Sequence, residues 1–493
     1  MRTIEPSFYQ EFRCIADQCP ITCCREWKIT VDDKTRKNWK KKSDAGLGIG
    51  ADDGLDTEAD AGLDTKADAG LNTEVYDGLG TGTDAGLNTG TDAEKTEVKR
   101  RLSSYLYKKE GQSVILLNHQ GNCPFLNDRK LCKLVLKWGD AVLSDTCRTF
   151  PRQTHEFDNC REYALVACCP AVIDLLNESG WNFLESDTWN NILDTEHKIE
   201  SLGRLPDKQH KIESPGRLPD TEHKIESQGR LQDKQHEVKA EIQHETEPST
   251  HCATEHDEAL YCLEIRNHCI EFLQKSEEDR MKNPDKQLVQ IFEELHGAYE
   301  NSGEWHNFDF LSKIRDIKET GSLDIAETLA ERNEIFMDIC ENYMKEQMYQ
   351  GYLKEIMLTA SELEKYGITE AMEKKYEEFL REIDTFTPLF YRYLCLEFYT
   401  DSVIPGDTLE DMILNTEWIF IEYTTIRHAL FLYYCNPDDK EQRLTYERVR
   451  DYMVIISRMT GYDEEDIHDY LADCFEHPVW PCGYAKLLLT EPG

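Results

Sequence analysis

The sequence predicts a mainly α-helical protein with an irregular, cysteine-rich N-terminal module and two inserted repeat tracts. Ten of the 18 cysteines precede residue 170, two tracts repeat with periods of eight and 13 residues, and apolar residues recur at helical spacing farther on. Apolar periodicity near 3.6 residues indicates amphipathic helices. We expect the module at residues 1–42 and 99–190, the repeat tracts at 43–98 and 194–256, and a helical domain at 257–493.

Composition limits the partners and the compartment. The 493 residues include 56 Lys and Arg against 96 Asp and Glu, which gives a formal net charge of −40 and argues against nucleic-acid binding. Residues 1–10 lack the pattern of a secretory signal, and no stretch approaches the roughly 18 uncharged apolar residues that span a bilayer. We therefore expect a cytoplasmic protein with no membrane partner. Because the cytosol keeps thiols reduced, 18 cysteines favour metal or redox chemistry over disulfides.

The first repeat tract, residues 43–98, repeats an eight-residue unit such as ADAGLDTK. Nearly every unit offers a single Leu for burial, and its Gly and Asp content favours turns over helix or strand. A calcium-binding β-roll is the alternative, but the order of the oxygen ligands does not match that motif. We therefore predict a disordered insert.

The second tract, within residues 194–256, repeats a 13-residue unit such as DTEHKIESLGRLP. One histidine recurs in each unit, and these are His197, His210, His223 and His236. None has a second His or Cys at helical spacing, as a chelating pair would require. A disordered, solvated linker is therefore the preferred interpretation over a metal-binding tract.

The cysteines before residue 170 stand in short motifs with Pro and aromatic neighbours. The motifs are FRC-x4-CPITCCREWKI from residue 12, CPFL-x5-C from residue 123, CR-x-FPR from residue 147 and CCP from residue 168. Because thiolates are soft donors, four of them suit tetrahedral zinc or an iron-sulfur cluster. The spacing matches neither a zinc ribbon nor a bacterial ferredoxin, so it leaves the metal open.

Seven cysteines are candidate ligands, of which three or four would suffice. They are Cys19, Cys23, Cys24, Cys123, Cys132, Cys147 and Cys169. For Cys14, Cys160 and Cys168 we expect the more ordinary role of small buried hydrophobic side chains.

These motifs, in this order and with these flanking residues, resemble the flagellin lysine-N-methylase family. That family shares its cysteine pattern with a wider group of zinc- or iron-chelating modules. The resemblance covers residues 1–40 and 111–180, and both repeat tracts lie between or after the matching blocks as insertions.

The resemblance implies a function. It implies transfer of a methyl group from S-adenosylmethionine to lysine ε-amino groups of flagellin, with a cysteine-ligated [4Fe-4S] cluster. Because no Gly-rich turn joins a strand to a helix, the sequence lacks the usual nucleotide-binding signature, and the cysteine module is the expected cofactor site. The alternative is a zinc-stabilised scaffold that binds a partner without catalysis.

Three further residues near the cysteines are candidate cofactor contacts. Arg148 and Arg152 could clamp the cofactor carboxylate in a bidentate fork, or they could neutralise a cluster that carries several thiolates. Trp27 could stack on the adenine or the sulfonium, although burial against the module is the simpler role. Catalytic residues are not assigned by the sequence.

The remainder of the chain reads as helices interrupted near prolines. Beyond residue 257 the expected helices include 326–352, 370–383, 389–399, 413–434 and 446–458. The apolar run Trp418–Cys435 contains Glu422, Arg427 and His428, which favours a core helix over a membrane span. Tyr423, Ile426 and Arg427, with Ser457 and Arg458 farther on, also resemble the C-terminal part of the flagellin methylases.

Overall fold

A computed structural model describes the two cysteine-bearing segments and most of the helical remainder. The described residues are 2–42, 101–109, 111–158, 160–178, 181, 183, 252–281, 284–300, 325–345, 348–436, 444–461, 464–475 and 477–489. The first predicted insert, 43–98, lies outside these residues, as does the second as far as residue 251.

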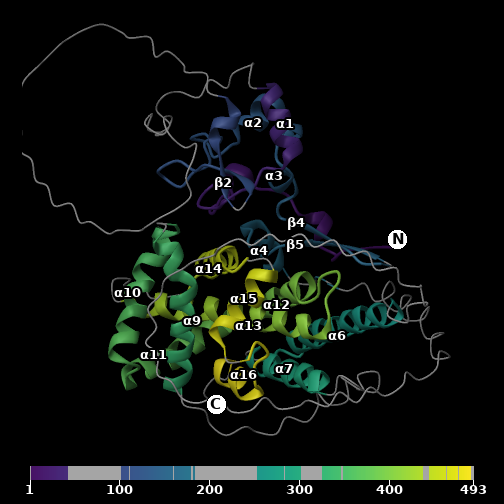
Figure 1. Cartoon of the computed structure of the whole chain (residues 1–493). Helices are drawn as coiled ribbons and strands as arrows, with labels where there is room; N and C mark the ends of the chain where they lie inside the picture. The colour runs from purple at the N-terminus through teal and green to yellow at the C-terminus, as the bar shows by residue number, and fades with distance from the viewer. Residues whose placement is uncertain are drawn as a thin grey trace, which may run out of the picture.

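The N-terminal segments form a small module of short helices and strands (Figure 1). Its helices are α1 (Asp33–Lys42), α2 (Lys133–Trp138) and α3 (Asp145–Thr149), and its hairpin pairs β2 (Leu106–Lys109) with β3 (Gln112–Ile115). A separate small core stabilises it, in which Trp39 packs edge-on against Phe125 and donates a 2.8 Å hydrogen bond to the Val142 carbonyl. The two halves of the module, which are distant in sequence, therefore share one core.

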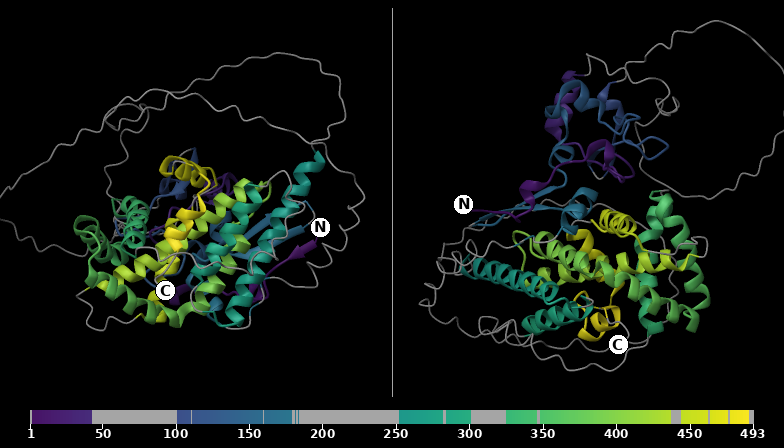
Figure 2. Two further views of the ribbon diagram at one scale, coloured as in Figure 1. Left: turned by 90° about the horizontal axis from the view of Figure 1, so that it is seen from below. Right: turned by 180° about the vertical axis from the view of Figure 1, so that it is seen from behind.

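A three-stranded sheet and one helix connect this module to the rest of the chain. β1 (Arg2–Ile4) pairs in parallel with β5 (Cys160–Leu165), which pairs antiparallel with β4 (Arg152–Glu156). The next helix, α4 (Pro170–Asn177), has Pro170 in its first turn, where a missing N–H costs nothing. Figures 1 and 2 show the α1–α3 part standing away from the long helices, with β4, β5 and α4 between them.

Long helices make up the remainder, as predicted. They are α6 (Cys252–Glu278), α7 (Asp285–Glu300), α9 (Ile325–Lys345), α10 (Gln350–Tyr366), α11 (Glu370–Ile383), α12 (Thr387–Asp401), α13 (Leu409–Cys435), α14 (Tyr446–Met459), α15 (Glu464–Cys474) and α16 (Cys482–Leu489). α13 lies at the centre and is buried on almost all of its faces, with α7, α9, α10, α12 and α14 packed around it. The mainly α-helical fold is thus confirmed.

The predicted core role of the apolar run in α13 is also confirmed. Glu422, Arg427 and His428 are all buried within the protein, each with polar partners. Among the described residues, no helix combines the length and apolar character that crossing a membrane requires.

One predicted helix is wrong, because residues 326–352 form two helices. Tyr349 has φ = 53°, which a right-handed helix cannot contain, and α10 begins directly after it. The Tyr349 side chain is buried, so packing in the core selects this conformation. Other helix bounds agree within a few residues, and α6 begins five residues before the expected position 257.

A buried ion pair joins the sheet to the helical region. Arg266 on α6 donates two hydrogen bonds of 2.7 Å to the two carboxylate oxygens of Glu162 on β5. Glu162 and Arg266 are 1% and 0% exposed, so each depends on the other for compensation of its charge.

We predict that Glu162→Gln destabilises the protein by about 3–5 kcal/mol, because Arg266 would remain buried without a counter-charge. Urea unfolding followed by circular dichroism measures the change. The control is Glu156→Gln, which removes the exposed ion pair between Glu156 on β4 and Arg161 on β5. This variant should lose less than about 1 kcal/mol of stability. Equal costs for the two variants would contradict the buried pair's importance.

Glu417 on α13 is a second buried acid with a measurable signature. Its side chain is 0% exposed and accepts a 2.7 Å hydrogen bond from the Trp480 backbone N–H. Burial raises its pKa to about 9, so the folded protein holds this carboxyl in its neutral form.

Stability should therefore fall as pH rises from about 4.5 toward 9, because the unfolded chain releases this proton and the folded chain keeps it. The Glu417 contribution has a slope of up to about 1.4 kcal/mol per pH unit. Glu417→Gln, a neutral isostere, should remove that contribution, so its stability relative to wild type should grow between pH 6 and pH 8 in urea titrations. Glu364→Gln on exposed α10 surface should show no such trend, and parallel curves for Glu417→Gln and wild type would refute the assignment.

Candidate metal and cofactor site

Backbone pairing brings the first two cysteine motifs together across the first insert. The Cys123 N–H donates a 2.7 Å hydrogen bond to the Cys24 carbonyl, and the adjacent residues Arg25 and Asn122 form an antiparallel bridge. A second bridge pairs Leu126 with Cys132. Cys24, Cys123 and Cys132 are therefore held on neighbouring loop segments that isolated β-bridges join.

The third motif is attached through the N-terminus of α3. The Ser144 hydroxyl caps this helix by accepting a 3.2 Å hydrogen bond from the Cys147 N–H. The Asp145 N–H donates to Asp32 at 3.0 Å, and the hydroxyls of Thr30 and Thr146 lie 3.0 Å apart. These contacts fix Cys147 beside the segment that follows Cys24.

Electrostatics shows that five of the seven predicted thiols lie close together. The hydrogen bond with Cys23, burial, and the charges of Cys23, Cys123 and Cys147 all raise the pKa of the Cys24 thiol. The same hydrogen bond lowers the pKa of Cys23 to about 7. Burial raises the pKa of Cys147 to about 11, with smaller contributions from the charges of Cys23 and Cys132. We call Cys23, Cys24, Cys123, Cys132 and Cys147 the thiol cluster.

Cys19 and Cys169 lie at the edge of this cluster. Cys169 precedes α4, and burial raises its pKa to about 12, with the charges of Cys19 and Cys23 adding to the shift. The Cys19 thiol donates to the Ile21 carbonyl at 3.2 Å. All seven predicted ligands therefore gather in one region.

The thiol cluster fits a soft metal or an iron-sulfur group by donor type and by number. Within the residues that the structure describes, no three His, Cys, Asp or Glu side chains stand at metal-binding distances. The thiols are thus neighbours, and ligation would require them to close around the ion.

The three cysteines expected to be simple hydrophobic side chains differ in environment. Cys160 is 3% exposed and confirms the expectation. Cys168 is half-buried. Cys14 is exposed, so the expectation that it is a buried hydrophobic side chain is wrong. Cys14 lies just before a short turn that keeps the chain at the surface, so it has no core to enter.

The three predicted cofactor contacts have partners within the protein. Arg148 is half-exposed and forms an ion pair with Asp145. Arg152 stacks its guanidinium 4.9 Å from the centre of the Phe12 ring. Trp27 meets the edge of the Phe150 ring at 4.7 Å and lies under the guanidinium of Arg458 at 5.1 Å.

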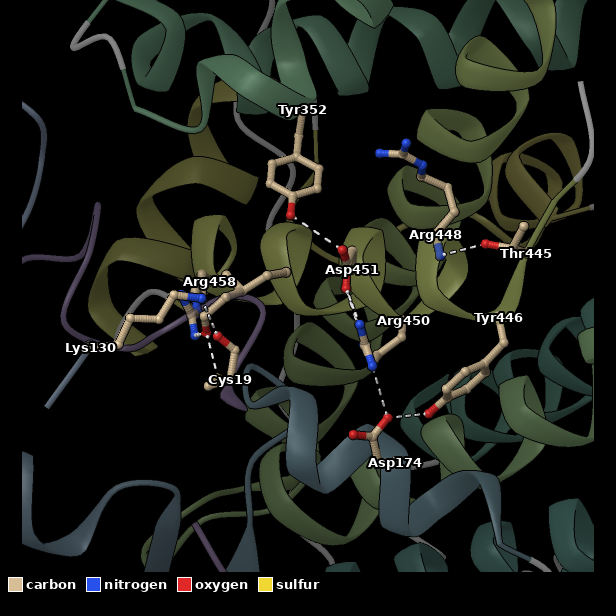
Figure 3. A network of polar contacts seen from close by, with 11 residues as sticks. Cys19, Lys130, Asp174, Tyr352, Thr445, Tyr446, Arg448, Arg450, Asp451 and Arg458 are labelled. Atoms are coloured by element: carbon tan, nitrogen blue, oxygen red, sulfur yellow. Dashed lines mark hydrogen bonds and ion pairs between the residues drawn. The ribbon is translucent and has the colours of Figure 1, made fainter. Parts of the chain in front are cut away.

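Arg458 is a functional candidate that the motif spacing did not identify. It lies on α14, and it reaches the cysteine loops from the helical region (Figure 3). Lys130, which the sequence also left unassigned, donates a 3.2 Å hydrogen bond to the Cys19 carbonyl. The only sequence signal was the Ser457-Arg458 pair, which resembled the C-terminal part of the flagellin methylases.

A cavity of about 630 Å³ opens beside the cysteine loops. Its lining is mostly polar and includes Pro20, Thr22, Arg25, Asn118, His119, Gln120, Asn122, Leu126, Asn127, Asp128 and Lys130. Several of these residues immediately neighbour the candidate ligands in sequence. The volume lies within the range of pockets that bind small molecules and cofactors.

Behind Cys168, the helical region buries carboxyl groups. Glu422 on α13 accepts hydrogen bonds from the hydroxyls of Tyr393, Ser457 and Thr460. Burial raises the pKa of the Cys168 thiol, and the charges of Glu422 and of Glu397 on α12 add to that shift. The thiol region therefore borders a polar, water-poor part of the helical core.

Comparison with known proteins gives one family match and several relatives whose names agree with it. Residues 262–488 match the family described as FliB lysine N-methylase C-terminal domain. Over 178 residues the chain is 26% identical to flagellar biosynthetic protein FliU of Salmonella muenchen, covering 35% of this chain and 76% of that protein.

It is 25% identical over 178 residues to the lysine-N-methylases of Salmonella choleraesuis strain SC-B67 and Salmonella typhimurium strain LT2. These alignments cover 35% of this chain and 32% of each relative, so the match spans about a third of those two proteins. No solved structure matches the chain. Together with the cysteine motifs, these matches confirm the predicted resemblance to the flagellin lysine-N-methylase family, and they place the similarity to its C-terminal domain at residues 262–488.

Proposed function

We propose that this protein is a cytoplasmic, S-adenosylmethionine-dependent protein-lysine N-methyltransferase that acts on flagellin and holds an iron-sulfur cluster through its thiol cluster. The gathering of seven predicted cysteine ligands from four motifs carries the proposal. The family match at residues 262–488, and relatives named as lysine-N-methylases and as a flagellar biosynthetic protein, support the reaction and the substrate.

The reaction sets clear chemical demands. A lysine ammonium has no free electron pair, so its proton must first pass to a base or to solvent. The neutral nitrogen then bonds to the methyl carbon while the carbon–sulfur bond breaks, which leaves S-adenosylhomocysteine. The site must therefore hold the methyl donor and the lysine in line and keep the lysine uncharged.

Among the described residues are candidates for holding the cluster and the methyl donor. Cys23, Cys24, Cys123, Cys132 and Cys147 would hold the cluster, with Cys19 and Cys169 as further ligands. When bound, such a cluster can supply an open iron position that anchors the amino and carboxylate groups of the methyl donor. The adjacent cavity has room for a nucleoside-sized molecule, and Arg25 and Lys130 in its lining can receive a carboxylate.

A zinc-stabilised scaffold is the second candidate. The observation that favours it is the packing of Cys24, Cys123, Cys132 and Cys147 against the small core of the module. Structural zinc sites close four ligands around the ion and stabilise small domains that have little core of their own. In that case the helical region would serve as a binding surface.

The deciding experiment uses the full chain purified without oxygen. We expect a brown protein with a broad absorption near ~400 nm, about four irons per chain, and a spectral change on adding S-adenosylmethionine. Incubation with flagellin and the methyl donor should add 14-Da increments, about the mass of one methylene per methyl group, to lysines in peptide mass spectra. A colourless protein with stoichiometric zinc and unmodified flagellin would overturn the proposal in favour of the scaffold.

Single cysteine variants test the ligand assignment. Cys123→Ser, Cys132→Ser and Cys147→Ser should each lower iron content and methyl transfer by more than about tenfold, because a hydroxyl is a poor substitute for a thiolate ligand. Cys14→Ser is the matched control, since Cys14 belongs to the same module but is exposed, and it should retain both. Wild-type iron content in all three ligand variants would refute the assignment.

A further inference from the structure

Arg458 joins the helical region to two cysteine loops through three hydrogen bonds. Its Nη2 donates to the Ile21 carbonyl at 2.9 Å, its Nη1 to the Thr22 carbonyl at 3.3 Å, and its Nε to the Cys168 carbonyl at 3.0 Å. The residue is 5% exposed. One side chain of α14 thus binds segments that lie more than 280 residues away in sequence.

The three accepting carbonyls have a common position relative to the candidate ligands. Ile21 and Thr22 directly precede the Cys23–Cys24 pair, and Cys168 directly precedes Cys169. The guanidinium is planar, and its N–H groups are fixed relative to one another, so it sets the separation of the two loops. Lysine, with a single ammonium on a flexible stem, could not reproduce that geometry.

The charge of Arg458 is buried. Among the described residues it takes part in no ion pair, although it is buried, and burying a lone guanidinium is costly. The guanidinium is hydrogen-bonded to Thr22 and Cys168, which directly precede Cys23 and Cys169, so the thiolates of those cysteines are anionic groups that its charge can offset. The Trp27 ring face, 5.1 Å away, is a further favourable neighbour.

We propose that Arg458 is a positioning residue that clamps the Cys19–Cys24 and Cys168–Cys169 loops onto α14 and offsets the negative charge of the thiolates gathered there. The clamp makes the family's C-terminal domain a structural part of the thiol site. Its charge role rests on the proposed function, whereas the clamp itself does not.

Arg450 on the same helix provides a matched comparison. It links α14 to α4 through a 3.3 Å contact with Asp174, and it pairs with Asp451 at 2.9 Å (Figure 3). Its partners are carboxylates, and none of them adjoins a candidate ligand. Arg450 thus anchors α14 to a different part of the chain, α4, and its ion pairs do not involve the cysteine loops.

The first test measures hydrogen–deuterium exchange in the metal-free full chain, comparing Arg458→Met, Arg458→Lys and Arg450→Met. Arg458→Met should raise exchange at residues 19–24 and 166–169, while Arg450→Met should leave both segments as in wild type. Arg458→Lys should also raise exchange, because lysine keeps the charge but cannot make the three guanidinium hydrogen bonds to the two loops. Wild-type exchange in both loops of Arg458→Met would overturn the clamp. If Arg458→Met fails to fold, Arg458→Lys decides on the same criterion.

The second test examines the role of the Arg458 charge. It measures iron content and midpoint potential after anaerobic reconstitution with iron and sulfide. Arg458→Met should retain less than about a tenth of the wild-type iron, and the residual cluster should have a more negative midpoint potential. Arg458→Lys should recover most of the iron and the wild-type potential, which a purely geometric role would not predict. Equal iron content and potential in Arg458→Met and Arg450→Met would overturn the charge role.

The outcomes separate this inference from the proposed function. Looser cysteine loops in Arg458→Met together with a zinc-bound, inactive wild type would refute the methyltransferase and leave the clamp standing. An active, iron-containing wild type whose Arg458→Met variant has unchanged loops would refute the clamp and leave the methyltransferase standing.

Discussion

The site depends on the packing of α14 between α13 and α4. Glu422, buried in α13, accepts hydrogen bonds from the Ser457 and Thr460 hydroxyls at the end of α14 and so fixes the rotation of that helix. Arg458 is the next residue after Ser457, about 100° farther around the helix axis, and from there it reaches the Ile21 carbonyl in the cysteine loops. A buried acid that would otherwise cost stability is thus satisfied by the contacts that orient the site.

Helix positions could be predicted because burial follows the helical period. Residues 370–383 form α11 as expected, and Pro388 lies in the first turn of α12, where proline is tolerated. The break at Tyr349 could not be predicted, because a tyrosine carries no local preference for positive φ. The conformation is stabilised by burial of the Tyr349 ring, a tertiary contact that no local sequence pattern encodes.

The same distinction applies to the site. Thiol chemistry and the order of the motifs selected the candidate cysteines, since residue type alone restricts what can bind a soft metal. Arg458 was not assigned a role, because a lone arginine in an amphipathic helix is usually solvated. Its burial and its carbonyl partners arise only when α14 meets loops from the other end of the chain.

The position of the first insert explains how the module can tolerate it. The strand segments on either side pair directly, since the Val31 N–H donates to the Ser113 carbonyl at 2.7 Å and the Ile115 N–H to the Ile29 carbonyl at 2.9 Å. Loop-closure entropy grows slowly with length, by about 0.6 kcal/mol for each doubling. The alignment of Cys24 with Cys123 is therefore set by the pairing of residues 29–31 with residues 113–115. The length of the repeat tract between these segments has little influence on the geometry of the thiol cluster.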